Sequence, residues 1–243
     1  MGKVAFITGA SGDIGRAVSM QLAKDGFSVA LGFNSNKNSA CELSQRLNSD
    51  CTKAIAVECD ITNSVSISNA LEQIKKELGS VELLVNNAGT ADIRLFTDNS
   101  YRDLSKMINT DLLGAMEVSR QVLADMIHAK KGCIINISSV WGEKGASCEV
   151  AYSAAKAGLI GFTKALAREE GPSGIRVNCI SCGFIDTKMN SSLSQQDKAA
   201  IIEDIPCGRL GTVQDIANAV SFIASEKADY INGQVIRVDG CWI

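Results

Sequence analysis

The sequence predicts an α/β protein with one doubly wound, parallel sheet of seven strands and helices on both of its faces. Short apolar runs alternate with longer amphipathic segments from one end of the chain to the other. Several of the runs are apolar at every position, as in strands that are covered on both faces. A glycine-rich turn links the first run to the first amphipathic segment, which is the connection expected at the start of such a sheet.

The predicted strands are short runs rich in β-branched and aliphatic residues. They lie at residues 3–8, 28–33, 53–58, 81–86, 133–138, 175–181 and 233–238. The predicted helices have apolar residues at helical spacing and lie at residues 13–26, 38–48, 64–79, 100–130 and 150–171. Glycine is common just beyond a helix, so Gly26, Gly79 and Gly171 are predicted to end three of them. Right-handed crossovers would then make the strands parallel.

One domain is predicted for residues 1–243, because no linker, repeat or low-complexity segment divides the 243 residues. The alternation of strands and helices is interrupted around residues 187–206. We interpret that stretch as a helical insertion on the substrate side, where mobile segments often cover a ligand.

Charge and composition exclude several classes of protein. The formal net charge is −3 and no basic patch stands apart from the acids, so no nucleic-acid partner is expected. No apolar run approaches membrane-spanning length and no secretion signal is found, which indicates a cytoplasmic protein without a membrane partner. The nine cysteines are scattered and favour reduced thiols. Cys179 and Cys182 have CxxC spacing, but His128 is the only histidine and no metal site is predicted.

The glycine-rich turn has the features of a Rossmann-type phosphate-binding turn. In "VAFITGASGDIGRAV", residues 4–18, Gly9 permits the tight turn and Gly15 permits close packing of the helix on the sheet. The helix that follows offers backbone N–H groups and the positive end of its dipole to a pyrophosphate. The turn therefore indicates a dinucleotide cofactor.

The end of the second strand distinguishes NAD from NADP. An acid there would bind the adenosine ribose hydroxyls and repel a 2′-phosphate, but Phe33 occupies that position. The residues that follow carry hydrogen-bond donors and one positive charge: Asn34, Ser35, Asn36 and Lys37. This pattern favours NADP(H).

A tyrosine and a lysine share one face of the helix predicted at residues 150–171. Tyr152 and Lys156 are one helical turn apart, and Ser139 lies upstream of both. A free phenol has a pKa of about 10 and is a weak acid at neutral pH, and a neighbouring ammonium lowers that pKa. Tyr152, Lys156 and Ser139 are therefore candidate catalytic residues.

Together these motifs resemble the short-chain dehydrogenase/reductase family along the whole chain. The matching stretches are "TGASGDIG" at 8–15, "CDIT" at 59–62, "NNAG" at 86–89 and "GFIDT" at 183–187, with the serine, tyrosine and lysine. Within that family, "YSAAKAGLIGFTKALA", "GIRVN", "IPCGRLG" and "INGQVIRVDG" are most similar to the 3-oxoacyl-[acyl-carrier-protein] reductases.

The resemblance implies an NADPH-dependent ketone reductase that converts a 3-oxoacyl thioester to its 3-hydroxyacyl form in fatty acid synthesis. It implies that Tyr152 protonates the developing alkoxide, that Lys156 assists it and holds the nicotinamide ribose, and that Ser139 binds the substrate oxygen. It also implies a homotetramer. The positions that match cofactor contacts of the family are Gly9, Ser11, Asp13, Ile14, Gly15, Asn34, Ser35, Asn36, Asp60, Ile61, Asn87, Ala88, Gly89, Tyr152, Lys156, Ile185 and Thr187.

Two acids depart from the family pattern. Asp13 stands where the family usually has a second glycine, and it either caps the helix that begins there or repels the pyrophosphate. Asp111 stands where the family usually has the asparagine of a catalytic tetrad. We expect Asp111 to keep the structural role of that asparagine at a helix kink and to tune Lys156.

The substrate stays open at this stage. A carrier protein is acidic and needs basic residues near the entrance; Lys130 matches one such family position, but Ser173 stands at the other. The loop with Trp141, Glu143 and Glu149 resembles a reductase branch that acts on a 5-aminopentanone group attached to elongation factor P, whose positive charge an acid would suit. Otherwise the tryptophan is a packed anchor and both glutamates are solvated. The third alternative, motivated by the two unusual aspartates, is a catalytically weak nucleotide-binding protein with a regulatory or assembly role.

Overall fold

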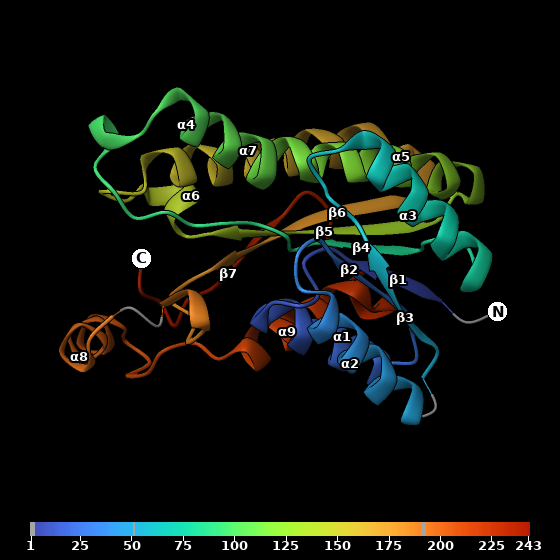
Figure 1. Ribbon diagram of the computed structural model, residues 1–243, viewed down its shortest axis with the longest axis horizontal. Coiled ribbons are helices and arrows are strands. Elements are labelled where there is room, and N and C mark those ends of the chain that lie inside the picture. The colour runs from blue at the N-terminus through green and yellow to red at the C-terminus, as the bar shows by residue number, and fades with distance from the viewer. Residues whose placement is uncertain (1–2, 51, 191–192) are drawn as a thin grey trace.

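The computed structural model describes residues 3–50, 52–190 and 193–243, which form one seven-stranded sheet whose neighbouring strands are all parallel. The strand order is β3-β2-β1-β4-β5-β6-β7 (Figure 1). The strands are β1 Val4–Ile7, β2 Ser28–Phe33, β3 Ala54–Glu58, β4 Leu83–Asn86, β5 Gly132–Ser139, β6 Ile175–Cys182 and β7 Val235–Val238. The predicted fold class is confirmed.

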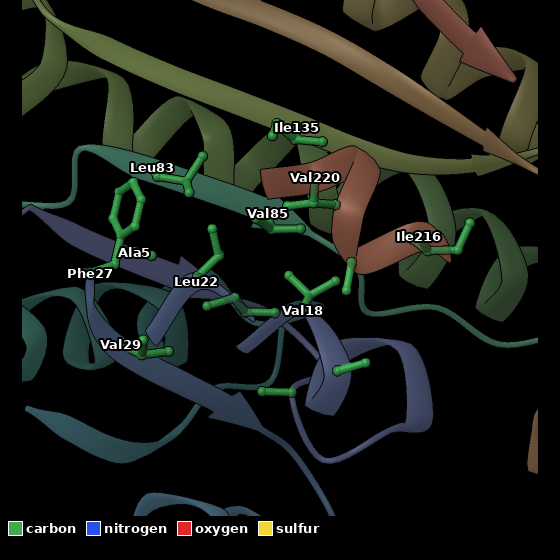
Figure 2. Packing of buried hydrophobic residues seen from close by; sticks show 14 of the residues in the cluster. Ala5, Val18, Leu22, Phe27, Val29, Leu83, Val85, Ile135, Ile216 and Val220 are labelled. Atoms are coloured by element: carbon green, nitrogen blue, oxygen red, sulfur yellow. The ribbon is translucent and has the colours of Figure 1, made fainter. Parts of the chain in front are cut away.

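Helices cover both faces of the sheet, and each face has its own apolar core (Figure 1). One face carries α1 Asp13–Lys24, α2 Lys37–Ser49 and α9 Val213–Ala224. The other carries α3 Ser64–Glu77, α4 Tyr101–Ile108, α5 Gly114–Ala129 and α7 Val150–Glu170. Val18 and Leu22 of α1 pack with Ile216 and Val220 of α9 against the central strands (Figure 2). Both faces are thus removed from water, which explains the continuously apolar strands.

The strand order reverses beside β1. β1 pairs with β2 on one side and with β4 on the other, so successive crossovers leave β1 in opposite directions. Ligands of doubly wound sheets bind at such a reversal, beyond the carboxyl ends of the strands. The glycine-rich turn after β1, the chain that leaves β4, and Ser139 at the end of β5 all lie at this edge.

α7 ends where predicted, with Gly171 as its C-cap residue, but the backbone of this glycine differs from that of the other two predicted end glycines. Gly26 and Gly79 have left-handed backbones beyond α1 and α3 (φ 89 and 113), as expected, but Gly171 stays helical (φ −52). The chain continues through a 3₁₀ turn at Gly171–Ser173 and leaves it at Gly174 (φ 76). A Cβ on Gly174 would lie 2.6 Å from the carbonyl oxygen of Lys130, so Gly174 is the position that requires glycine.

Two further helical regions differ from the prediction. The helix predicted at 100–130 is divided by a π-helical turn at Asn109–Leu113 between α4 and α5. α9 was not predicted, although Thr212 and Asp215 form a capping box at its start. The capping box was therefore a local signal for this helix.

Residues 187–206 contain a 3₁₀ turn at Lys188–Asn190 and α8 Gln195–Asp204. Residues 191 and 192 of the predicted insertion lie outside the described residues. Across the described ranges, no helix combines the length and the apolar character needed to span a membrane.

Candidate active site

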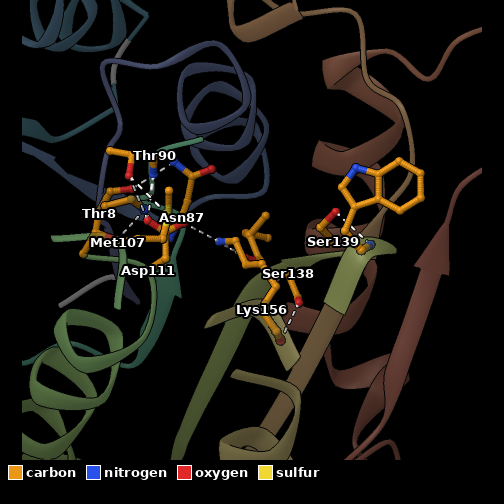
Figure 3. Close-up of polar contacts among 11 residues, drawn as sticks. Thr8, Asn87, Thr90, Met107, Asp111, Ser138, Ser139 and Lys156 are labelled. Carbon is orange, nitrogen blue, oxygen red and sulfur yellow. Dashed lines mark hydrogen bonds and ion pairs between the residues drawn. The ribbon is translucent and has the colours of Figure 1, made fainter. Parts of the chain in front are cut away.

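The glycine-rich turn after β1 is braced by the chain that leaves β4 (Figure 3). Gly9 has a left-handed backbone (φ 63), and a Cβ on it would lie 2.8 Å from Cα of Ala88. The Thr8 hydroxyl accepts hydrogen bonds from the backbone N–H groups of Asn87 (3.0 Å) and Ala88 (3.1 Å). The side-chain amide of Asn87 donates to the carbonyl oxygens of Thr8 (3.0 Å) and Gly9 (3.1 Å). Asn87 therefore fixes the shape of the turn, and the hydrogen-bond donors of its side-chain amide are used within the protein.

α1 begins at this turn with backbone N–H groups that face outward. Gly12 is the N-cap residue, and the Arg16 N–H group donates to its carbonyl oxygen (2.8 Å) as the first bond of the helix. The N–H groups before Arg16, including that of Ile14, precede this pattern and can bind an anion, which the helix dipole also favours. A Cβ on Gly15 would collide with the carbonyl oxygen of Gly9, so only glycine lets the helix start this close to the turn.

Asp13 is held by the segment that follows β6. It is the first residue of α1, and its Oδ2 accepts a hydrogen bond from the backbone N–H of Lys188 (2.7 Å). The predicted capping role is wrong, because Gly12 occupies the N-cap position. The contact brings Thr187, the residue before Lys188, toward the start of α1.

The predicted adenosine contacts begin at the end of β2. Phe33 is buried as the last residue of β2, so the exposed Asn34 and Ser35 are the first side chains beyond it. The carbonyl oxygen of Ser11 accepts a hydrogen bond from the Ser39 hydroxyl (3.4 Å). Asn36 is the N-cap of α2, and its side-chain oxygen accepts a hydrogen bond from the Ser39 N–H group (3.4 Å). The oxygen of Asn36 is thus engaged by the helix.

Two of the other predicted contacts are buried isoleucines. Ile61 follows β3 and packs against Gly114, at which any Cβ would lie 2.8 Å from Cδ1 of Ile61. Ile185, beyond β6, is also buried. Asp60 accepts hydrogen bonds from the N–H group (2.9 Å) and the hydroxyl (2.7 Å) of Thr62, so its carboxylate orders the start of the loop.

Ser139, Tyr152 and Lys156 come together beyond the carboxyl end of β5. The Ser139 hydroxyl accepts a hydrogen bond from the N–H group of Trp141 (3.2 Å) and also contacts the Tyr152 phenol. Tyr152 and Lys156 lie one turn apart on α7, with Nζ of Lys156 5.4 Å from the centre of the Tyr152 ring. Lys156 is buried, and its Nζ donates to the carbonyl oxygen of Ile137 (3.2 Å). The positive charge is therefore fixed beside the phenol.

A buried carboxylate lies on the other side of this lysine. Asp111 is in the π-helical turn, and its Oδ2 is 3.2 Å from Nζ of Lys156, with the two side chains 0% and 7% exposed. Its Oδ1 accepts hydrogen bonds from the N–H group (2.9 Å) and the hydroxyl (3.2 Å) of Thr90 (Figure 3). A Cβ on Gly89 would lie 2.7 Å from Oδ2 and 3.3 Å from Nζ, so this glycine leaves room for the ion pair.

The pKa values of this group differ from the simple expectation of an acidified phenol. Burial raises the pKa of Tyr152 above its usual value; the Lys156 ammonium opposes this shift, and the Asp111 carboxylate adds to it. Burial disfavours the charged form of Lys156, but Asp111 and Tyr152 act in the opposite direction, and the net effect is a raised lysine pKa. The ammonium lowers the pKa of the phenol as predicted, but burial raises that pKa by more, so the phenol is protonated at neutral pH.

The loop after Ser139 is tied to the last strand. Glu143 lies in α6 Trp141–Lys144 and accepts hydrogen bonds from the Ser181 hydroxyl (2.6 Å) and the Arg237 guanidinium (2.8 and 3.0 Å). The hydrogen bonds from Arg237 keep the pKa of Glu143 below its usual value. Glu143 is thus at the surface, but its carboxylate is held by these partners and its charge is offset by Arg237.

Trp141 is packed, and Glu149 beside it is half-buried. The rings of Trp141 and Trp242 lie 5.0 Å apart at 58°, and Phe184 meets Trp242 edge-on at 6.1 Å. Burial raises the pKa of Glu149, and a hydrogen bond with Trp141 opposes that shift. The expected anchoring role of Trp141 fits these contacts, whereas Glu149 is less solvated than expected.

Three further residues support the site, and the sequence patterns did not single them out. Thr8 could have been found, because it directly precedes Gly9 in the glycine motif. Thr90 and Arg237 meet Asp111 and Glu143 from 21 and 94 positions away, so no local pattern marks them.

The CxxC cysteines are buried on β6. Burial raises the pKa of Cys179 to about 11 and that of Cys182 to about 12, so both thiols stay protonated. In the part of the chain that the structure describes, no group of three or more histidine, cysteine, aspartate or glutamate side chains could hold a metal ion.

Comparisons with known proteins identify the family of the chain. The family model described as "Enoyl-(Acyl carrier protein) reductase" matches residues 9–242. The chain is 41% identical to the 3-oxoacyl-[acyl-carrier-protein] reductase FabG of Escherichia coli (strain K12), over 98% of this chain and 96% of that protein. It is 38% identical to an uncharacterized oxidoreductase, YmfI, of Bacillus subtilis (strain 168), over 100% of this chain and 99% of that protein.

A solved structure is similar throughout. The crystal structure of a putative gluconate dehydrogenase from Agrobacterium tumefaciens superposes with a TM-score of 0.95 at 29% identity, covering 99% of this chain and 95% of that chain. The resemblance inferred from the motifs is thereby confirmed over the full sheet. The chain belongs to the short-chain dehydrogenase/reductase family of oxidoreductases.

Proposed function

We propose that the protein is an NADPH-dependent ketone reductase that converts a 3-oxoacyl thioester to the 3-hydroxyacyl thioester. The observation that carries this proposal is the group formed by Ser139, Tyr152 and Lys156 at the carboxyl edge of the sheet, beside the braced glycine-rich turn. The group supplies a proton donor next to a fixed positive charge, and the turn supplies an anion-binding helix N-terminus.

The residues around the turn fit the phosphates of NADPH. The first N–H groups of α1 precede its own hydrogen-bond pattern, and Gly12 presents no side chain to a ligand. Asn34, Ser35 and Lys37 are exposed beyond β2 and would hold the 2′-phosphate. When bound, NADPH supplies the hydride that reduces the ketone carbon.

The side chains of the site supply the proton and hold the charges. Tyr152, kept protonated by burial, donates its proton to the ketone oxygen. Lys156, held by Asp111 and the Ile137 carbonyl, then stabilises the phenolate. Ser139 donates a hydrogen bond that orients the ketone oxygen toward the phenol.

A carrier-bound substrate is supported by relatives, whereas Lys130, expected near the entrance, lies at the other end of β5 from Ser139. FabG of Escherichia coli, which is 41% identical to this chain, is named a 3-oxoacyl-[acyl-carrier-protein] reductase. Lys130 ends α5 just before β5, whereas Ser139 ends β5, so the eight-residue strand separates them by roughly 25 Å. A carrier docked at Lys130 would therefore serve the site of a neighbouring subunit, which agrees with the proposed homotetramer.

Steady-state turnover of acetoacetyl thioesters with NADPH tests the proposal. We expect oxidation of NADPH with the thioester, slower oxidation of NADH, and loss of turnover in Tyr152→Phe. Binding of NADPH without turnover on any ketone would instead support the nucleotide-binding regulatory alternative and overturn the proposed reaction.

The half-buried Glu149 favours a second candidate, the reduction of an amine-bearing ketone attached to a protein. Its carboxylate is beside Trp141 in the loop between Ser139 and Tyr152, where a carboxylate and an aromatic ring could attract an ammonium group. The 5-aminopentanone group on elongation factor P is such a substrate. Turnover of an amino ketone, but not of acetoacetyl thioester, together with its loss in Glu149→Gln would favour this candidate.

A further inference from the structure

The segment beyond β6 is attached to the sheet mainly at its two ends. We call Lys188–Asn190 and Leu193–Asp204 the flap; it contains the 3₁₀ turn and α8. Before it, Ile185 forms a short parallel bridge with Gly211, and after it Ile205 is buried. None of the residues of α8, all of them described, is buried. Segments with so few buried contacts open at low cost in free energy.

Among the described residues, one hydrogen bond joins the flap to the nucleotide-binding turn. Oδ2 of Asp13, in the first turn of α1, accepts the hydrogen bond from the backbone N–H of Lys188 at 2.7 Å. The ion pair between Lys198 and Asp186 (3.0 Å) connects the flap only to the chain just before it. Asp13 is therefore the side chain through which α1 holds the start of the flap.

The hydrogen bond between Asp13 and Lys188 is of a kind that can hold the flap firmly against α1. The carboxylate of Asp13 lies at the positive end of the α1 dipole, where a negative charge is stabilised. A hydrogen bond from an N–H group to a carboxylate is stronger than one between neutral groups. The donor is backbone, so the contact fixes the path of the chain at Lys188 whatever side chain stands there.

We propose that Asp13 is a latch that holds the flap against α1 and so closes the nucleotide site over the bound pyrophosphate. The proposal rests on the proposed binding of NADPH. Opening of the Asp13–Lys188 hydrogen bond frees the start of the flap and lets the nucleotide leave. Asp13 is thus a positioning residue that governs nucleotide exchange.

Four variants test the latch. Asp13→Ala removes the acceptor, and Asp13→Asn keeps an oxygen acceptor without the charge. Lys188→Pro removes the backbone donor at the first position of a 3₁₀ turn, where proline is tolerated, and Lys188→Ala is its matched control because it keeps the donor. Circular dichroism and a thermal melt of each variant show whether it is folded.

Two measurements are made on each variant. Stopped-flow fluorescence follows NADPH release into excess NADP⁺, and hydrogen exchange of the flap amides is followed without nucleotide. We expect Asp13→Ala and Lys188→Pro to release NADPH about fivefold faster, which corresponds to about 1 kcal/mol, and to exchange the flap amides faster. A double variant with Asp13→Ala and Lys188→Pro should show nearly the same effect as either single variant, because both substitutions remove the same hydrogen bond.

The controls decide the interpretation. Lys188→Ala should resemble the unchanged protein, and Asp13→Asn should lie nearer to it than to Asp13→Ala. Unchanged flap exchange in Asp13→Ala, or equal effects of Lys188→Ala and Lys188→Pro, would overturn the latch. Failure of the unchanged protein to bind NADPH would count against the proposed function, and the exchange measurement without nucleotide would still judge the contact.

Discussion

The ion pair between Lys156 and Asp111 acts on the pKa of the Tyr152 phenol with two opposing charges. A lysine buried alone would lose its proton readily, but the carboxylate 3.2 Å away keeps it charged. The same carboxylate offsets part of the ammonium's effect on Tyr152, whose pKa stays raised by burial. The proposed site is therefore set to donate a proton, which suits reduction at neutral pH.

Asp111→Asn is expected to move the alkaline limb of the pH–rate profile for reduction to lower pH. Reduction needs protonated Tyr152, so the rate falls as pH rises through the pKa of the phenol. Asp111 raises that pKa, and removing its charge lowers the pKa and brings the fall closer to neutrality. Asp125→Asn, an acid of α5 paired with Lys75 at the surface, is the control and should not move the limb. A limb that stays in place in Asp111→Asn would remove the tuning role.

Tyr152→Phe is expected to lower kcat/KM for ketone reduction by about a hundredfold or more, because the general acid is lost. The fold and the affinity for NADPH should be retained, since the ring remains in place. Steady-state kinetics and fluorescence titration check both expectations. Reduction at an undiminished rate would show that another group donates the proton.

Local spacing predicted part of this site and could not predict the rest. Tyr152 and Lys156 lie one turn apart on a single helix, so their pairing follows from helical geometry alone. The ion pair with Asp111 depends on the packing of α7 against a π-helical turn from another part of the chain. The partner of Asp13 is a backbone group of Lys188, which no residue pattern can indicate.

At the scale of elements, the turn between β1 and α1 is the most constrained connection. Gly9 combines a left-handed backbone with a contact to the chain after β4, and Gly15 packs on the carbonyl of Gly9. The two strands that flank the reversal are thus joined both through their ladder and through this turn. Its shape depends on tertiary contacts as well as on glycine.

Gly9→Ala is expected to destabilise the protein by about 3 kcal/mol, from the left-handed backbone and from the collision with Ala88. Gly26→Ala separates the two effects, because Gly26 is also left-handed (φ 89) but a Cβ there meets nothing within 4 Å. It should cost only about 1 kcal/mol. Denaturant unfolding of both variants checks this, and equal losses would contradict the role of the contact.

The elements themselves were predictable where their signals are local. The strands followed from short apolar runs covered on both faces, and α1 to α3 from helical spacing. α7 ends at the predicted glycine, but the left-handed residue lies further on, at Gly174, where the close approach to Lys130 requires glycine. Helical spacing did not indicate the π-helical turn, but the resemblance implied a helix kink at Asp111, which lies in this turn.

On the scale of the whole molecule, apolar side chains remain exposed on the face that carries α5. Leu113, Met116 and Ile127 are 48%, 37% and 42% exposed, at or near the surface of that helix. Phe222 of α9 is 48% exposed on the opposite face. Apolar surface on two faces is suited to the two kinds of two-fold contact that a tetramer with dihedral symmetry needs.

A homotetramer is therefore the expected state in solution. Light scattering coupled to size exclusion should give a mass four times that of one chain, 25.7 kDa. Met116→Glu, which places a charge on the exposed face of α5, should lower that mass without unfolding the subunit. A mass of one chain for the unchanged protein would refute the tetramer.

The chain enters the sheet at the amino end of the central strand β1 and leaves it at the carboxyl end of β7 (Figure 1). β1 starts after Lys3, at the amino ends of the strands, whereas Ser139 lies at their carboxyl ends. β7 runs toward Trp242, whose ring contacts that of Trp141. A fusion partner or surface linker joined ahead of Lys3 would leave the reacting edge clear. One joined after Ile243 would begin beside the tryptophans, close to Ser139 and the candidate site.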